Sequence, residues 1–520
     1  MARRIKVFFR LGLAFWVRVG HRNGLEWTFF ESLHWIVCAL LTAVKRTWIP
    51  CLALMALAIG ALPVHAQELK LTQKKNGKTL KVKPRKTKAG SLHFEHSGRT
   101  YIFPLEELTE DSRKEVEAWQ KGKDAAIHEA IGLQIFKAGT ALWEEKSGEV
   151  AKRLGWPVES STSGCRSYRH YPESKTRFIG TRPYCCTLYG DDENMTDRLS
   201  MVFANKGDFN SMAGRGEDHF KKVVNGEKVD MTLNEAIERD IEVIKERLTL
   251  ALGKPTEQRY GEKEGRRDVL RWDHRGHAFI LSQRDDEYAH LLIVDEETAD
   301  RQGRAKLVKD ADFAGILRKN LKKSDNGDVL ITNIPMVDQG PKGYCAPATF
   351  ERTMRYMKVP ADMYLLATLA TAPGGGTNTY LLAEEATRII RSKGRRIKEL
   401  ELNEDLDMTE VKRYLNKGVP ILWQMASIED YNNAVNEMNR KRLKIDDVEK
   451  WKGEVKFYTD ALLPVMHNQS NHHICMIIGY NEATGEIAVS DSWGPQYELR
   501  WVPIKVAQAI TTGGGFVIDL

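Results

Sequence analysis

The predicted fold depends on one stretch, Val337-Asp-Gln-Gly-Pro-Lys-Gly-Tyr-Cys-Ala-Pro-Ala-Thr-Phe350. The apolar segment 329–337, at whose end this stretch begins, is typical of a strand or an extended arm. A turn rich in Gly and Pro follows, and helical spacing begins after Cys345. Apolar residues then fall near one helix face: Ala346, Phe350, Met354 and Met357. Pro347 suits the first turn of this helix, because a proline there loses no hydrogen bond. The stretch therefore predicts a strand, a tight turn and a helix that starts at Cys345.

The position of Cys345 favours a reactive thiol. A helix N-terminus carries a partial positive charge, which stabilises the nucleophilic thiolate form. Gln339 can bring its side-chain amide back towards this thiol across the turn that contains Gly343. Taken alone, a cysteine before a helix is most often a small buried apolar residue. A nucleophile also needs a nearby base and a third group that orients the base.

A hairpin near the C-terminus supplies candidates for both groups. Residues 473–480 and 486–491 are strand-like, and the polar turn 481–485 joins them. His473 begins the first strand and Asp491 ends the second, so antiparallel pairing brings them to the same end of the sheet. His472 is the alternative base, because a one-residue shift in register exchanges the two faces of a strand.

Three motifs in this order resemble those of papain-like cysteine peptidases. They are Asp338-Gln-Gly-x-x-x-x-Cys345, Asn471-His-His-Ile-Cys-Met-Ile-Ile-Gly-Tyr480 and Asp491-Ser-Trp-Gly494. The similarity is closest to the family-39 (bacteriocin-processing) peptidases and their stand-alone relatives. The resemblance implies a papain-like domain over residues 328–520, in which a helical part precedes an antiparallel sheet.

The resemblance also implies a role for each residue. Cys345 would attack the carbonyl carbon, His473 would exchange the proton, and Asp491 would orient His473. The Gln339 amide and the Cys345 backbone N–H would hold the oxyanion. Trp493 is expected to shield the Asp–His pair from water, and Trp493 and Gly343 are candidate substrate-binding residues. No cofactor and no metal ion are expected.

The rest of the chain is expected to form three further segments, since 520 residues exceed one ordinary domain. Residues 1–66 are predicted to be an export signal with an N-terminal extension, 67–110 a small β unit, and 111–325 a helical and α+β middle region plus linker. Expected elements include a helical stretch over about 107–154, strands at 177–180, 185–189 and 199–204, a helix over 234–252, and a strand meander over 268–294. The predicted class is α+β.

Residues 67–110 resemble the small SH3-like barrel called the Sla homology domain. Short segments alternate apolar and polar residues, and turns are expected at Asn76-Gly and Ser97-Gly: the segments begin at Leu69, Thr79, Ser91 and Tyr101. An unrelated β-hairpin module is the alternative. Neither interpretation assigns a catalytic residue to this unit.

Charge and hydropathy at the N-terminus indicate export. Residues 1–66 hold eight Lys/Arg and two Glu, so +6 of the net charge of +7 lies there and about +1 remains for the rest. Lys45 and Arg46 precede an apolar run, and Val64-His-Ala66 is an acceptable cleavage site. We expect a periplasmic or secreted protein, with an uncleaved signal anchor as the alternative and as the only expected membrane contact. The small remaining charge excludes a nucleic-acid-binding function based on charge.

Five cysteines follow residue 66, and an odd number in an exported chain implies at least one thiol outside a disulfide. Cys165 is expected to pair with either Cys185 or Cys186, and spacing does not choose between them. No pair of CxxC type, as found in metal sites, occurs in the sequence.

These patterns predict an exported thiol peptidase that acts on a peptide or protein substrate. One alternative is a catalytically silent binding or scaffold protein that keeps the fold. The other is an acyl transferase or amidase acting on cell-wall peptides. The large N-terminal part is a possible pro-region that holds the activity in check.

Overall fold

The computed structural model describes residues 4–8, 14–18, 68–88, 90–211, 216–261, 266–304, 309–340, 343–370, 377–402, 406–445, 447–466 and 471–520. Two compact units are distinguished, Met1–Pro63 and Val64–Leu520. In the first, strands β1 (Arg4–Phe8) and β2 (Ala14–Arg18) pair antiparallel. The predicted signal from Lys45 to Ala66 lies outside the described residues. Within the described ranges, no helix combines the length and the apolar character needed to cross a membrane.

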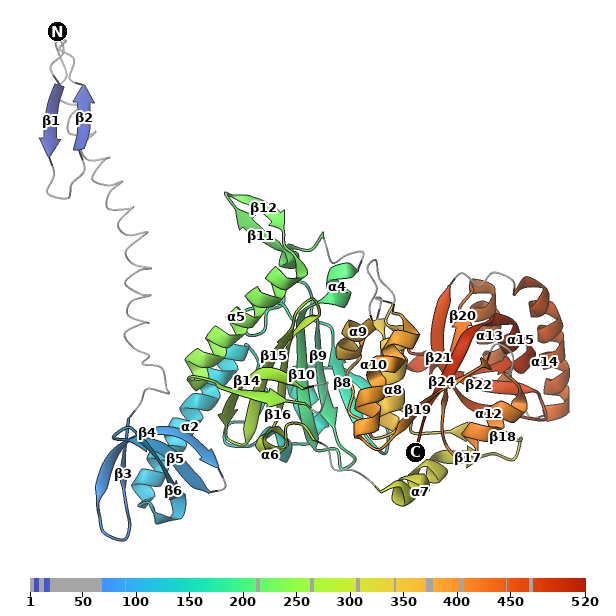
Figure 1. Cartoon of the computed structure of the whole chain (residues 1–520), viewed down its shortest axis with the longest axis horizontal. Coiled ribbons are helices and arrows are strands. Elements are labelled where there is room, and N and C mark those ends of the chain that lie inside the picture. The colour runs from blue at the N-terminus through green and yellow to red at the C-terminus, as the bar shows by residue number, and fades with distance from the viewer. Residues whose placement is uncertain are drawn as a thin grey trace. The chain divides into compact units, whose positions relative to one another are not determined.

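The second unit begins with a four-stranded antiparallel sheet (Figure 1). Its strands are β3 (Leu69–Thr72), β4 (Thr79–Lys88), β5 (Ser91–His96) and β6 (Arg99–Pro104), followed by η2 (Leu105–Glu107) and α2 (Glu110–Ile131). The Thr109 side chain caps α2, and Trp119 of this helix packs into the core of the small sheet. The strands pair consecutively as a meander, and an SH3-like barrel remains a prediction.

The middle region, residues 142–300, is built on an eight-stranded antiparallel sheet ordered β13-β14-β15-β16-β10-β9-β8-β7. Helix α5 (Leu233–Leu252) packs its apolar side against this sheet, and Thr232 and Glu235 form a capping box at its start. The strands of the sheet are β7 (Val158–Ser161), β8 (Arg166–His170), β9 (Cys185–Gly190), β10 (Thr196–Asn205), β13 (Thr256–Tyr260), β14 (Arg267–His274), β15 (His277–Arg284) and β16 (Tyr288–Asp295). The other elements are η3 (Leu142–Glu144), α3 (Ser147–Leu154), α4 (Lys206–Asn210), η5 (Asp218–Phe220), α5 (Leu233–Leu252), α6 (Glu296–Asp300) and a separate hairpin of β11 (Lys221–Val224) and β12 (Glu227–Asp230).

Some expected elements of the middle region differ from those observed. The helix expected over 107–154 is interrupted at Gly132, whose φ of 79° requires the left-handed conformation. Residues 177–180 form a turn, because Ile179 and Gly180 both have positive φ. The sequence did not predict β8, since its buried Ser167 and Arg169 face polar partners in the C-terminal region.

The C-terminal region, residues 310–520, places helices before an antiparallel sheet ordered β17-β18-β21-β20-β24-β19, with β22 pairing β21 and β23. Together with the middle region, this confirms the predicted α+β class. Its helices are α7 (Asp310–Asn320), α8 (Cys345–Tyr356), α9 (Met363–Ala370), α10 (Thr379–Ser392), α12 (Met408–Leu415), α13 (Glu429–Arg442), α14 (Val448–Leu462), η8 (Leu463–Val465), η9 (Pro495–Tyr497) and α15 (Ile504–Ile510). Its strands are β17 (Leu321–Lys323), β18 (Asp328–Ile331), β19 (Arg396–Leu400), β20 (Ile421–Ala426), β21 (His472–Asn481), β22 (Glu486–Ser490), β23 (Arg500–Pro503) and β24 (Thr511–Asp519).

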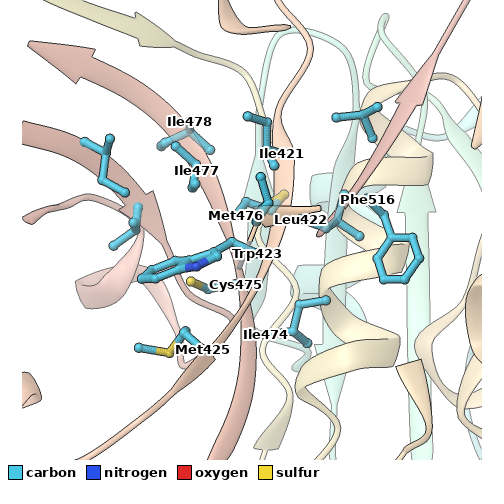
Figure 2. Packing of buried hydrophobic residues seen from close by; sticks show 14 of the residues in the cluster. Ile421, Leu422, Trp423, Met425, Ile474, Cys475, Met476, Ile477, Ile478 and Phe516 are labelled. Atoms are coloured by element: carbon cyan, nitrogen blue, oxygen red, sulfur yellow. The ribbon is translucent and has the colours of Figure 1, made fainter. Parts of the chain in front are cut away.

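Strands β20 and β21 carry the core of this sheet (Figure 2). Trp423 is fully buried, and its indole N–H donates to Thr511 Oγ1 at 2.9 Å. Gly479 allows β18 to approach, because a Cβ there would lie 2.6 Å from the Val329 carbonyl oxygen. In the antiparallel register of β20 on β21, His473 lies opposite Met425.

The predicted disulfide is not formed, and Cys165, Cys185 and Cys186 are all free thiols. Strands β8 and β9 pair antiparallel, with Arg166 opposite Gly190 and His170 opposite Cys186. Cys165 therefore lies at the other end of the ladder from the two adjacent cysteines. Cys186 packs into the middle-region core, whereas Cys185 packs against the C-terminal region.

Candidate active site

Cys345 is the first residue of α8, and its side chain is partly exposed. The backbone N–H groups of Ile474 and Ala346 hydrogen-bond to its sulfur, and so does the side chain of His473. Burial alone would raise the pKa of the Cys345 thiol, but these three donors outweigh burial and lower it. The thiol therefore lies in surroundings that favour the thiolate.

His473 is the buried member of the His472–His473 pair, because successive residues of β21 point to opposite faces. Its Nε2 lies 2.8 Å from Oδ1 of Asp491, the residue that directly follows β22. Burial alone would lower the pKa of His473, but its bonds to Asp491 and Cys345 raise that pKa to about 9. The lowered pKa of Cys345 and the raised pKa of His473 both favour the thiolate–imidazolium pair over the neutral pair. His472 is exposed and points away from this pair.

Asp491 is fully buried, and each of its two carboxylate oxygens accepts from a different side chain, His473 or Arg500. Oδ1 accepts from His473, and Oδ2 accepts from Nε of Arg500 at 3.0 Å and also from its Nη2. Burial alone would raise the pKa of Asp491, but Arg500 and His473 together hold it below its usual range. The carboxylate is therefore charged and fixed in orientation.

Gln339 is held by the loop that follows Asp491. Its backbone N–H donates to the Ser492 carbonyl at 2.8 Å, and its Oε1 accepts from Ser492 Oγ at 2.8 Å. Because the amide oxygen is engaged in this way, the Nε2 end is left to donate to another acceptor.

Trp493 stacks on His473, with ring centroids 4.5 Å apart and an interplanar angle of 27°. It covers one face of the imidazole, as expected for a residue that shields the Asp–His pair. Gly343 lies in the turn before Cys345 with φ of 70°, a conformation that favours glycine. A role for Gly343 in substrate binding stays a prediction. Pro341, His467 and the Gly-rich residues 374–376 lie outside the described residues.

Sequence reasoning missed two arginines that organise the site. Arg500 is a single buried charge among apolar neighbours in β23, and such a charge signals a buried partner. Arg352 lies two helical turns after Cys345 on the same face of α8. It donates to the carbonyl oxygens of Pro335 at 2.9 Å and of Asp491 at 2.8 Å, and thus ties the two loops together.

No group of three or more potential metal-ligating side chains occurs within the described residues. What the arrangement offers is a polarised thiol, a base that is fixed by a carboxylate, and an amide donor. These are the groups that acyl transfer by a nucleophilic cysteine requires.

Comparison with known families agrees with this geometry. Residues 331–509 match the model of the Peptidase_C39 like family, so this part of the chain is a C39-like domain of the papain-like peptidase class. The prediction of that class is confirmed, and the match supports a peptidase-type function. Comparison with curated proteins finds no match.

Proposed function

We propose that the C39-like domain hydrolyses peptide bonds with Cys345 as nucleophile, His473 as general acid and base, and Asp491 as the residue that orients His473. The observation that carries the proposal is the position of His473, whose Nε2 lies 2.8 Å from Asp491 Oδ1 and whose side chain also interacts with the Cys345 thiol. The lowered pKa of Cys345 and the raised pKa of His473 support the same assignment.

In the first step, the Cys345 thiolate attacks the carbonyl carbon and the C=O electron pair moves onto oxygen. The Gln339 Nε2 and the Cys345 backbone N–H donate to this oxyanion, each contributing roughly 3 kcal/mol in comparable sites. Nε2 of His473 is engaged by Asp491, so Nδ1 is the nitrogen that faces the sulfur. Its proton passes to the leaving amine, the C–N bond breaks, and an acyl thioester remains.

In the second step, neutral His473 takes a proton from water as the water oxygen attacks the thioester carbon. The same two donors hold the second oxyanion. Its collapse releases the carboxylic acid product, and the sulfur leaves as the thiolate beside protonated His473, which restores the starting pair.

The direct test uses the full chain and its Cys345→Ala variant. We expect the wild-type protein to hydrolyse labelled casein and to be modified at Cys345 by a peptidyl acyloxymethyl ketone, and the variant to do neither. Unchanged casein hydrolysis in Cys345→Ala, or no modification of folded wild-type protein, would exclude the peptidase assignment. Modification of Cys345 with cleavage of cell-wall peptides but not of casein would identify an amidase or transferase that uses the same nucleophile.

We also propose that the protein is exported. The support is the Lys45–Arg46 pair, the apolar run after it and the small residues at Val64-His-Ala66. We expect the mature protein to begin at Gln67 and to be found outside the cytoplasm. N-terminal sequencing of protein from each cell fraction tests this, and a full-length chain retained in the membrane would identify a signal anchor.

A further inference from the structure

The middle region contacts the loop that carries the oxyanion donor. The Met336 N–H donates to Ser160 Oγ at 3.0 Å, and the Asp338 N–H donates to Glu159 Oε1 at 3.2 Å. The hydroxyl of Tyr171 donates to the Asp338 carbonyl at 2.9 Å. Both polar groups of the Asp338 backbone, immediately before Gln339, are therefore bonded to side chains more than 160 residues earlier in the chain.

Glu159 is itself held in place. Its side chain is buried, with 3% exposed. Its Oε1 accepts from Nε of Arg169 at 2.6 Å, and its Oε2 accepts from Ser167 Oγ at 2.8 Å. A buried and fully engaged carboxylate is a rigid acceptor for the Asp338 N–H, because moving it would leave other buried groups unpaired.

The same region contacts the other end of the loop. Helix α4 places Gly207 directly against Tyr344, the residue before Cys345. A Cβ at Gly207 would lie 1.5 Å from the Tyr344 hydroxyl oxygen, so no larger residue fits without displacing that ring. The middle region therefore contacts both ends of the loop between Met336 and Tyr344 and fixes their positions.

A buried polar interface also joins the middle region to α8. Nη2 of Arg169 donates to both carboxylate oxygens of Glu351 on α8, at 3.1 and 3.0 Å, and Glu351 is fully buried. The hydroxyl of Tyr189 bridges Glu351 at 3.2 Å and Asp362 at 3.1 Å. Removing the middle region would take Arg169 away from Glu351. The Glu351 carboxylate would then lose its principal cation, at a large cost in stability. A pro-region that is cleaved away would not be expected to share such a network.

We propose that the middle region is a permanent part of the active site, with Glu159 and Tyr171 as positioning residues for the oxyanion donor Gln339. Ser492 fixes the Gln339 side chain from the C39-like domain, and Glu159 and Tyr171 fix the backbone before it. This inference rests on the proposed function, since it assigns Gln339 a place in acyl transfer. In this proposal the middle region is not a removable pro-region. It stays in place and helps the active site to bind the transition state by positioning Gln339.

Two small reagents separate positioning from general damage in the full-length protein. With p-nitrophenyl acetate, the Cys345 thiolate attacks the acetyl carbonyl, an oxyanion forms, p-nitrophenolate leaves and an acetyl thioester remains. With iodoacetamide, the same thiolate displaces iodide at a saturated carbon, and no oxyanion forms. The ratio of the two rates therefore reports the oxyanion donors, after the rate of Cys345→Ala has been subtracted for other thiols.

We expect Tyr171→Phe and Glu159→Gln to lower the acylation rate about tenfold while the alkylation rate stays within about twofold. Gln339→Ala is the reference for loss of the donor, with acylation reduced by about 100-fold or more. The matched control is Tyr184→Phe, which removes a buried middle-region hydroxyl that bonds Glu217 at 2.9 Å, away from the loop. It should leave both rates unchanged.

Two results would overturn the inference. One is an unchanged acylation rate in both Tyr171→Phe and Glu159→Gln, and the other is an equal loss of acylation and alkylation rates in these two variants. The first would show that the contacts do not position the donor, and the second would indicate unspecific destabilisation. Failure of the proposed function has a different signature. In that case the wild-type protein and Cys345→Ala would react with the two reagents at the same rates.

Discussion

Arg500 and His473 bind the two oxygens of one buried carboxylate, Asp491. Oδ1 lies 2.8 Å from His473 Nε2, and Oδ2 lies 3.0 Å from Arg500 Nε. Arg500 is anchored in turn by Asn432, whose Oδ1 accepts from Nη1 at 3.0 Å. Asn432 belongs to α13, so a helix between β20 and β21 supports the orientation of the base.

Arg500→Gln should weaken both folding and acyl transfer. Loss of the cation leaves Asp491 buried with one charged partner instead of two, which typically costs about 3–5 kcal/mol of stability. We expect acylation by p-nitrophenyl acetate to fall at least about tenfold, because Asp491 and His473 lose their fixed orientation. Urea unfolding and burst kinetics measure the two effects. Arg500→Lys restores the charge but not the two-point contact and should recover only part of each loss.

Cys345 should stay reactive at a pH where an ordinary thiol is not. A thiol of ordinary pKa loses about 100-fold in thiolate population between pH 8 and pH 6. Because the pKa of Cys345 is lowered, its alkylation by iodoacetamide should fall less over this range than that of an ordinary thiol. Peptide hydrolysis should instead decline as pH rises through about 9, where His473 loses the proton for the leaving amine. Alkylation that follows an ordinary thiol profile would contradict the ion pair.

His290 should make the fold sensitive to acid. It is buried beside Ser200, whose Oγ lies 3.0 Å from its Nε2, and burial lowers its pKa to about 4 despite nearby Asp362. The unfolded chain binds the proton near pH 6.5, so this contribution is present above pH 6.5 and is lost as pH falls towards 4. In His290→Gln, the free energy of unfolding should depend less on pH over this range, by up to about 3 kcal/mol. Parallel pH profiles for the two proteins would contradict the expectation.

Ile477→Ala should test the core of the C39-like domain. Ile477 is fully buried in β21, opposite Ile421 of β20 (Figure 2). Its truncation leaves a cavity and should cost about 2–5 kcal/mol by urea unfolding. Leu443→Ala is the surface control, because Leu443 is 81% exposed, and its effect should stay within about 0.5 kcal/mol. Equal effects of the two substitutions would mean that the described packing is wrong.

The C-terminal fold was predictable where local pattern and motif coincide. Pro347 and the apolar spacing after Cys345 marked the start of α8, and the turn 481–485 marked the hairpin of β21 and β22. Alternation along β21 then explains why His473 and not His472 faces Asp491. In each case residues close together in the sequence are enough to predict the local structure.

The rest depends on contacts between distant segments, which one sequence does not reveal. Ser160 in β7 and Arg169 in β8 look like surface residues of polar strands. They are buried because they contact Met336 and Glu351, which lie far along the chain. Cys165 and Cys185 have spacing compatible with a disulfide, but the register of β8 on β9 separates them. Arg500 stands out in the sequence as a charged residue among apolar neighbours. That it pairs with Asp491 is evident only from the folded sheet.

The apolar cluster that joins the two regions has a consequence for how the molecule unfolds. Cys185 and Val202 of the middle region pack in one cluster with Val337, Tyr344 and Met363 of the C-terminal region. The limits of the family match, residues 331–509, therefore cut through a shared core and do not mark an independent folding unit. We therefore expect the middle and C-terminal regions to unfold together, as one cooperative unit that extends beyond the limits of the family match.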